Sequence, residues 1–586
     1  MLIIPGFTPD DQVPGVVAHS EWGAGPISIG AIPLTCVLYG NKGSAGTAAV
    51  NVRKPVTTDE EADAFFEPRS ELARMAHAAL AVPGVTLACC PVAEGVGAVS
   101  AFLKINFSGS WTVSGELGFQ FDEQPVRVNI AASHTPDTAA EAVAAAFNQA
   151  QNGRLFGTAV AASGVVTIEV FSKGRRGNQH RAFMTTTLKP AGMNVSFEQY
   201  TPIAKSSTGP AITIAGPATL GGAYELTIST AGTNGTAEFG LTRNGVAVAT
   251  GVTVPTTPFT YPIADDTGSV ITFGNGTHVL NEVHSWTTTV TAANGSHQFH
   301  GGTGIDDIED ALEGTESSTN DYIGLAHNDA TNVAAVEVAA NEKAAFDIGK
   351  LESYVAATNG TLAEAIALGQ VTMNDRLGLL AWASEHPEHP SRLAARVAAV
   401  MSVTEGADPN HNYDDEVVPG AAPHYRGVSD NPNRSTLKAA LSNSVSPLVT
   451  IDDKLTFVRL ICSRSLNGST PDYRTYDRGD VAVPIRVRKE AVALGNQMKA
   501  ENPYVGPDVA EGLPPAGTMT PALWVSKLSA KMQEWEGADF NWLEQVAENP
   551  PRATYDKVTK RIMSIVPVIA KSQFHQLGII VRQQAA

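Results

Sequence analysis

The spacing of apolar residues changes character several times along the chain, and each change marks an expected domain boundary. Residues 21–96 and 298–433 both have the texture of an α/β domain, in which short apolar runs alternate with segments of helical periodicity. The expected elements are a strand at 34–39, a helix at 61–80, a strand at 85–91, a strand at 322–326, a helix at 341–357, a strand at 377–382 and an Ala-rich helix at 392–403. Because both stretches show the same alternation of predicted strands and helices, we predict one α/β core domain that is split by an insertion.

The insertion reads as β structure almost throughout, and we divide it into domains at 97–205 and 206–297. In the first, apolar residues alternate with polar ones over 109–130, with turns at Gly115 and 123–125 and further strands at 158–160 and 165–171. One Ala-rich helix is expected at 138–150, capped by Thr135 or Asp137. In the second, short strands separated by Gly, Asn, Thr and Pro predict a β-sandwich. Domain insertion is tolerated in exposed loops, so both inserts are expected to be peripheral.

The C-terminal part, residues 434–576, mixes strands and helices. A strand is expected at 455–463, a mixture of strand and helix at 481–499, and a helix at 520–535 with Pro521 in its first turn. The two chain ends, residues 1–20 and 577–586, have no local partner and are expected to be extended arms. The predicted fold is therefore a split α/β core with inserted all-β sandwich-like domains and an α+β C-terminal domain that carries extended terminal arms.

Charge and cysteine usage narrow the classes of function. The 586 residues carry a formal net charge of −19, which repels phosphate backbones and anionic membranes, so neither direct nucleic-acid binding nor membrane binding is expected. The chain has 4 cysteines and no C-x-x-C pair, and Cys89 and Cys90 lie in an apolar run, which indicates buried strand residues. The N-terminus lacks the basic and apolar regions of a signal peptide, so a reducing compartment is expected.

The sequence is poor in catalytic signatures. The Gly-rich segment 40–47 lacks the closing Gly-Lys-Ser/Thr of a phosphate loop, and no Gly-x-Ser-x-Gly or His-Glu-x-x-His motif occurs. His297 and His300 are flanked by glycines and are not expected on a helix, and the segment beginning at Asp408 has Tyr413 and Pro419 where a calcium loop needs Gly and Glu. The acidic residues of 306–310 are read as a helix N-terminus. We therefore expect no catalytic residue, no metal site and no cofactor.

One charged segment is unusual. From Pro551 to the end the chain carries six Lys or Arg residues against one acid, Asp556. Lys557, Lys560 and Arg561 are spaced i, i+3, i+4, which aligns them on one helical face. The segment is either a solvated helical face or a docking surface for an acidic partner.

Short motifs along nearly the whole chain resemble the contractile-tail sheath proteins of Mu-like phages. They stand at 4–16 (Ile-Pro-Gly-Phe…Val-Pro-Gly-Val), 115–130, 174–178 (Gly-Arg-Arg-Gly-Asn), 407–423 (Ala-Asp-Pro…Val-Pro-Gly-Ala-Ala-Pro), 435–459 and 565–574. The chain departs from the family pattern at 460–463, where Leu-Ile-Cys-Ser replaces Ile-Thr-Thr-Tyr, and 206–297 is an additional module.

This resemblance implies a structural subunit of a bacteriophage virion. Such subunits stack as hexameric rings in a helical polymer around an inner tube and contract to drive the tube through the host envelope for genome ejection. The implied partners are further copies of the chain, the tail tube protein, and the baseplate and tail terminator proteins. The implied localisation is the virion tail, after assembly in the bacterial cytoplasm.

The resemblance also assigns roles to particular residues. Terminal arms of neighbouring subunits add strands to a sheet in a third subunit, and the C-terminal domain faces the tube while the inserts face outward. The arm residues are then Pro14, Val16, Ile579, Ile580 and Val581. We assign the tube contact to Arg552, Lys557, Lys560 and Arg561.

Two other readings remain open. A β-rich virion surface, baseplate or adhesin protein would explain the two inserts, although not the unpaired arms or the split core. A hydrolase with β-sandwich modules is the third reading.

Overall fold

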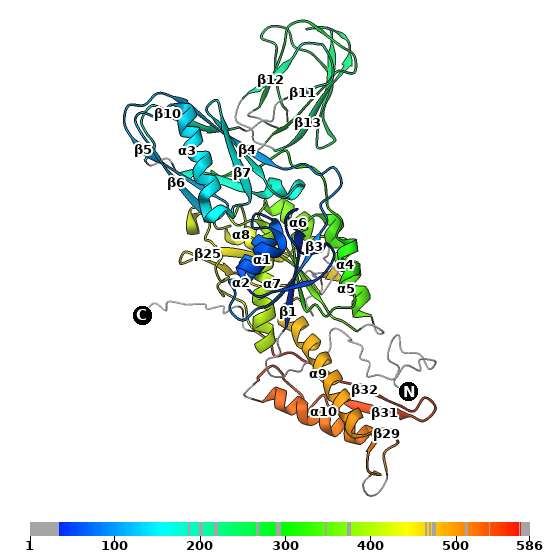
Figure 1. Cartoon of the computed structure of the whole chain (residues 1–586). Helices are drawn as coiled ribbons and strands as arrows, with labels where there is room; N and C mark the ends of the chain where they lie inside the picture. The colour runs from blue at the N-terminus through cyan, green and yellow to red at the C-terminus, as the bar shows by residue number, and fades with distance from the viewer. Residues whose placement is uncertain are drawn as a thin grey trace, which may run out of the picture.

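The computed structural model describes residues 34–573 and 575, except 186–187, 199–202, 216–220, 265, 267–268, 289–294, 346–348, 372–376, 463–465, 468–469, 472–475, 510–513 and 538–539. Both predicted arms, and with them Pro14, Val16, Ile579, Ile580 and Val581, lie outside the described residues. The described part is a mixed α/β structure with many separate sheets. In Figure 1 the two β-rich inserts lie at one end, the core lies in the middle, and the C-terminal helices and hairpin lie at the other end.

An eight-stranded sheet forms the centre of the core. Its strands, in spatial order, are β2 (Lys54–Val56), β3 (Thr86–Val92), β1 (Thr35–Asn41), β22 (Tyr322–Leu325), β23 (Ser353–Thr358), β24 (Gly378–Trp382), β25 (Ser446–Ile451) and β26 (Lys454–Phe457). The strands from β3 to β25 are parallel, and β2 and β26 are antiparallel edge strands. Because β1 pairs with β22, two segments separated by both inserts meet at the middle of the sheet. The sheet also extends past residue 433, the predicted end of the core, through β25 and β26.

Both faces of this sheet are buried, which explains the continuous apolar runs in its strands. On one face, Cys36 and Leu38 pack against helices α1 (Asp59–Phe66), α2 (Glu71–Leu80) and α7 (Pro390–Ala407). On the other, Val37 and Tyr39 pack against α4 (Glu309–Gly314), α5 (Ala330–Ala344), α6 (Leu362–Gly369) and α8 (Arg434–Leu441). The predicted burial of Cys89 and Cys90 in a strand is confirmed.

Several core elements differ from the sequence prediction. The predicted helix at 61–80 is two helices, because Glu67 adopts a φ of 74° and Ser70 caps a new helix. The predicted helix at 341–357 is wrong. Helix α5 begins after Asp329, whose side chain accepts from the Asn332 N–H, and ends at Ala344, and β23 follows. The Ala-rich run that suggested a helix is a fully buried parallel strand.

The first insert is a β-sandwich with one helix. One sheet contains β10 (Met193–Phe197), β4 (Phe102–Gly109), β8 (Val165–Val170) and β7 (Gly157–Ala162), and the other contains β21 (His297–Gln298), β9 (Arg181–Thr185), β5 (Gly115–Phe121) and β6 (Gln124–Ile130). Helix α3 (Pro136–Gln149) begins with a capping box between Thr135 and Thr138, so Thr135 is the cap and the predicted alternative, Asp137, lies in the first turn. Gly115 begins a strand and is not a turn residue, and the turn between β5 and β6 is at Asp122 and Glu123.

The second insert is all β in its described residues. A five-stranded sheet, β11 (Ala204–Lys205), β20 (Val283–Thr288), β13 (Gly222–Thr230), β15 (Glu238–Arg243) and β16 (Val246–Thr253), packs with a three-stranded one, β12 (Ile212–Ala215), β18 (Val270–Phe273) and β17 (Thr260–Pro262). A two-stranded ribbon pairs β14 (Gly232–Thr233) with β19 (Thr277–His278). The chain leaves the first insert and returns to it at one place, because the rings of Phe197 and His297 stack with their centroids 4.0 Å apart.

Excision of the second insert is expected to leave the remainder folded. We would replace residues 199–294 by four Gly/Ser residues, which reach up to about 13 Å. Because this module has its own apolar core, the free energy of unfolding of the rest should change by only about 0.5 kcal/mol. Thermal melts followed by circular dichroism check this result. An excised protein that aggregates or lacks a cooperative transition would contradict it.

The C-terminal part is built on α9 (Gly479–Glu501), α10 (Pro521–Glu536) and the hairpin of β31 (Arg552–Asp556) and β32 (Arg561–Ile565). Pro521 occupies the first turn of α10, as predicted. The mixture of strand and helix predicted at 481–499 is wrong, because α9 is continuous. The apolar alternation arises because Val481 and Ile485 pack into the core cluster, whereas Val483 and Val487 pack into the C-terminal cluster. The strand predicted at 455–463 ends at Phe457.

Candidate functional site

The basic residues at the C-terminal end lie on a β-hairpin and not on a helix. Arg552 pairs with Ile565 at the open end of the hairpin, whereas Arg561 pairs with Asp556 next to the turn. Lys557 and Lys560 lie in that turn, and both are exposed, as is Arg552. The i, i+3, i+4 spacing therefore does not place Lys557, Lys560 and Arg561 on a helical face. It reflects a four-residue turn between two strands.

Hydrogen bonds to Asp556 shape the turn. Its Oδ1 accepts from the Val558 N–H at 2.8 Å, and its Oδ2 accepts from the Thr559 hydroxyl at 2.8 Å. The hydroxyl bond from Thr559 is the main reason that the pKa of Asp556 is lowered. Val558, between the two lysines, is 88% exposed. The turn thus presents an apolar tip flanked by two ammonium groups.

A second cluster of charges lies between the core and the first insert, and we call it the ionic seam. Its members are five arginines, Arg74, Arg176, Arg181, Arg392 and Arg396, and five carboxylates, Glu71, Asp122, Glu123, Asp306 and Glu388. All are buried except Glu123, whose side chain is 11% exposed. Four of the arginines form ion pairs with the five carboxylates, whereas the Arg181 guanidinium donates to the Ser296 hydroxyl and the Asn359 carbonyl. Burial of ionic groups demands such partners.

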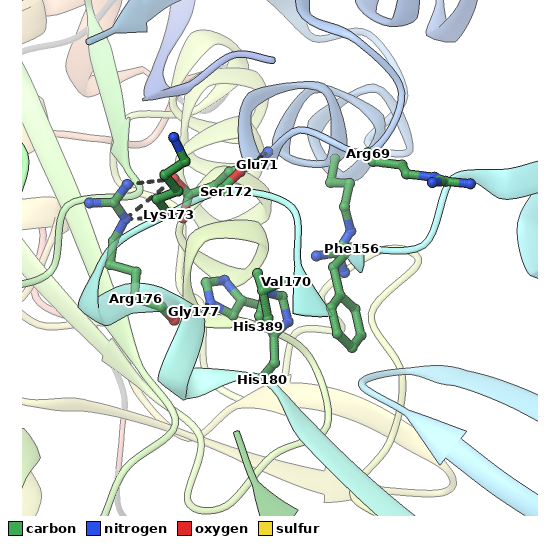
Figure 2. A pocket seen from close by; sticks show the side chains of 11 residues that line it. Arg69, Glu71, Phe156, Val170, Ser172, Lys173, Arg176, Gly177, His180 and His389 are labelled. Atoms are coloured by element: carbon green, nitrogen blue, oxygen red, sulfur yellow. Dashed lines mark hydrogen bonds and ion pairs between the residues drawn. The ribbon is translucent and has the colours of Figure 1, made fainter. Parts of the chain in front are cut away.

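Arg176 is the residue that joins the first insert to the core. It belongs to the Gly-Arg-Arg-Gly-Asn motif of the insert, and it points at Glu71 at the start of α2 (Figure 2). Its guanidinium lies 2.9 Å from Glu71 Oε2 and 2.6 Å from Asp306 Oδ2, and it also donates to the Asn41 side chain. Burial by itself raises the pKa of Glu71, but the charge and hydrogen bonds of Arg176, together with the nearby His389 and His327, outweigh burial and lower this pKa to about 2.

Asp122, in the β5–β6 turn, forms the second contact across the seam. Its carboxylate accepts from Arg74 of α2 at 3.2 Å, from the Arg181 N–H at 3.0 Å and from His180 Nδ1 at 2.6 Å. The His180 ring stacks on Phe156 on one side and on His389 on the other. Both histidines are grouped beside Phe156 in Figure 2.

The third contact uses the start of α7. Glu388 accepts from Arg396 at 2.7 Å and from Arg392 at 3.3 Å, and Arg392 also reaches Glu123 of the insert at 2.5 Å. His389 caps α7, because its Nδ1 accepts from the Ser391 N–H, while Nε2 lies 3.1 Å from the Arg176 carbonyl. Two of the three contacts thus begin at helix N-termini of the core, on α2 and α7.

Acid is expected to weaken the seam. Burial, with a further contribution from His180, lowers the pKa of His389 to about 3. His386, whose Nδ1 accepts from the N–H of Glu388 in the seam, is also buried, and burial lowers its pKa to about 4. The unfolded chain binds protons at these residues below about pH 6.5 but the folded chain does not, so stability is lost as the pH falls from about 6.5 toward 4. At pH 5 each histidine should cost about 2 kcal/mol.

Urea unfolding at pH 7.5 and pH 5.0 measures this loss. Glu71 stays ionised over that range because its pKa is about 2. Burial also lowers the pKa of His297 and His300 to about 4 and that of His424 to about 3, so these histidines add to the total difference, and a variant at His389 isolates the part that belongs to the seam. A His389→Asn variant keeps a capping side chain and should show a smaller difference between the two pH values. Equal urea midpoints for the wild-type protein at both pH values would contradict the assignment.

A further buried ion pair joins the core to the C-terminal part. Arg478, directly before α9, donates to Glu405 of α7 at 2.8 and 3.0 Å and to the Ser353 hydroxyl at 2.8 Å. Tyr322 and Tyr413 donate to the same carboxylate. Burial favours the neutral guanidine, but Glu405 reverses this and raises the pKa of Arg478. The orientation of α9 is therefore fixed by the core.

The remaining candidates from the sequence have structural explanations. His297 lies on β21 and His300 packs edge-on against Phe102, so they are not two ligands on a helix. Asp306 is buried in the seam and is not a helix-terminal acid, whereas Glu309 and Asp310 do lie in the first turn of α4. In the described ranges no group of three or more His, Cys, Asp or Glu residues could hold a metal ion. The same part of the chain contains no helix long and apolar enough to cross a membrane.

The seam itself was not found by sequence reasoning. Arg176 was noted inside a motif, Asp306 inside an acidic run, and Glu123 and Arg392 only as parts of a predicted turn and a predicted helix. Glu71 and Arg176 are 105 positions apart, and no local spacing reveals such a pair. A signal that could have revealed the seam is the presence of arginines and acids in strands and helices that are otherwise apolar.

The chain is similar to solved structures of tail-sheath proteins. A sheath tail protein from Desulfitobacterium hafniense shares 11% identity with a TM-score of 0.39, over 92% of this chain and 92% of that chain. One from Listeria innocua shares 11% identity with a TM-score of 0.40, over 93% of each chain. A chain of the anti-feeding prophage baseplate shares 14% identity with a TM-score of 0.29, over 46% of this chain and 70% of that chain. No protein-family model and no curated protein matches the sequence.

Proposed function

We propose that this protein is the structural subunit of a contractile tail sheath of the Mu-like kind. Copies would stack as hexameric rings in a helical polymer around an inner tube and contract to drive the tube through a host envelope. The observation that carries the proposal is the order of the short sheath-like motifs along nearly the whole chain. The division of the molecule supports it, since the inserts and the basic hairpin lie at opposite ends (Figure 1).

Negative-stain electron microscopy of the purified protein tests this function. A sheath subunit should form striated hollow cylinders. Isolated multimeric particles would favour the second reading, a virion surface, baseplate or adhesin protein, and monomers would overturn the proposal.

The β31–β32 hairpin is the proposed tube contact. It carries Arg552, Lys557, Lys560 and Arg561 at the end of the molecule away from the inserts. Single exposed ion pairs contribute only about 0–1 kcal/mol, but one set per subunit, repeated around each ring, can hold a sheath on its tube.

Charge reversal at the hairpin tests the tube contact. Changing Arg552 and Arg561 to Glu should leave empty sheath polymers and reduce sheathed tubes about tenfold or more in co-expression with the tube protein. The control reverses Lys499 of α9 and Lys527 of α10, which are also exposed. Normal numbers of sheathed tubes from the hairpin variant would show that the assignment is wrong.

The same hairpin is the proposed receiver of the terminal arms. In the described part of the chain its sheet has two strands, so each strand has one edge on which a strand from another subunit can pair. We propose that the arms around Pro14–Val16 and Ile579–Val581 of neighbouring copies supply those strands.

A further inference from the structure

A row of exposed acids of the core lies on one short helix and its flanks. On and beside α4, the side chains of Asp307, Glu309, Asp310, Glu313 and Glu316 are all exposed. The nearby cations are fewer and half-buried: Lys350 donates to the Glu316 carbonyl, and Arg53 lies on the loop beside Gly314. In Figure 1, α4 lies on the outer side of the core and is not covered by either insert.

This surface also has an apolar component. The loop at 50–53 packs against the end of α4, because a Cβ at Gly314 would lie 2.3 Å from the Asn51 carbonyl oxygen. Val50 and Val52 of that loop are 39% and 54% exposed. Valines beside a row of carboxylates form a surface that fits a partner with an apolar tip between positive charges. We call Val50, Val52, Glu309, Asp310, Glu313 and Glu316 the α4 face.

The turn of the β31–β32 hairpin has the complementary character. Val558 is 88% exposed, and the exposed ammonium groups of Lys557 and Lys560 flank it. In Figure 1 the hairpin lies in the C-terminal part and α4 lies beside the core sheet, so the two surfaces of one molecule do not meet. A contact between them requires two copies.

We propose that the α4 face binds the Lys557–Lys560 turn of a second copy of this chain. Val558 would contact Val50 and Val52, while the lysines would face the carboxylates of α4. The inference deepens the proposed function by naming a surface through which copies join, but its test needs neither a tube nor a polymer. If the Lys557–Lys560 turn binds a second copy, it cannot also bind the tube. The proposed tube contact then rests on Arg552 and Arg561.

Sedimentation velocity of the full-length protein with charge-swap variants tests the contact. Lys557→Glu/Lys560→Glu and, separately, Glu309→Lys/Glu313→Lys should each lower the association constant at least tenfold. Combining all four changes should restore the association constant to within about threefold of wild type, because residues of opposite charge again face each other across the interface. The wild-type association should also weaken in 0.5 M salt, which screens exposed charges.

The controls separate this contact from general charge effects. Lys499→Glu/Lys527→Glu changes the net charge equally and should associate like wild type. Val558→Asp keeps both lysines and should also weaken association. The inference is overturned if the wild-type protein stays monomeric, if the turn variant associates normally, or if the fourfold swap fails to restore association. Failed rescue together with loss of tube binding would assign the turn to the tube alone.

Discussion

Replacing Arg176 by alanine is expected to lower the free energy of unfolding by about 3–5 kcal/mol, because Glu71 and Asp306 would remain buried without their partner. Both carboxylates are almost inaccessible to solvent, so water cannot replace the guanidinium. For a cooperative unit made of the core and the first insert, such a loss corresponds to a fall in melting temperature of about 8–15 °C. Differential scanning calorimetry measures it directly.

Arg175 provides a matched control, because it precedes Arg176 in the same motif and is exposed. Arg175→Ala should change the melting temperature by less than about 2 °C. Arg176→Lys keeps the charge but loses the planar fork that reaches two carboxylates, so it should be intermediate. If Arg176→Ala and Arg175→Ala melt alike, the seam does not hold the insert on the core.

The seam also changes how the first insert should be regarded. Sequence reasoning expected both inserts to be peripheral, and for the second one the return of the chain beside Phe197 fits that expectation. The first insert instead shares buried charges with α2 and α7. Removing it whole would expose these groups to water, whereas removing one partner would leave the others buried and unpaired. Point substitutions are therefore the more damaging change.

Local sequence patterns predicted the elements that are buried in a uniform way along their length. The strands β1, β3, β22 and β24 were found because parallel strands covered on both faces are continuous apolar runs. Caps such as Thr135 were found because their hydrogen bonds are local in sequence. The error at 341–357 arose because alanine fits a helix and a buried strand equally well, and only the neighbouring strands decide between them.

Two further errors also arose because a local sequence pattern does not determine how a segment packs. The alternation in α9 comes from one helix that packs into two separate cores, which no single periodicity describes. The lysine spacing in the hairpin matches a helical face by coincidence, since a four-residue turn places charges at similar intervals. Contacts between distant segments, such as those of Arg176, leave almost no local trace.

Loss of the C-terminal arm is expected to abolish polymers while the subunit stays folded. Residues 577–583, Leu-Gly-Ile-Ile-Val-Arg-Gln, are β-prone and have no local partner in the sequence, so their N–H and C=O groups need a sheet to pair with. Seven extended residues span about 23 Å, enough to reach an adjacent subunit. Pairing there would tether rigid bodies that must slide and rotate during contraction.

Deleting 577–586, or changing Ile580 to Pro, should therefore reduce cylinders in electron micrographs at least a hundredfold, because the first removes the strand and the second removes a ladder hydrogen bond from it. Circular dichroism and the thermal melt should match those of the wild-type protein, since a strand that pairs with a sheet of another subunit adds no packing to its own. Deleting only Gln584, Ala585 and Ala586 is the control and should leave assembly unchanged. Cylinders of normal length from the 577–586 deletion would rule out arm exchange as the link between subunits.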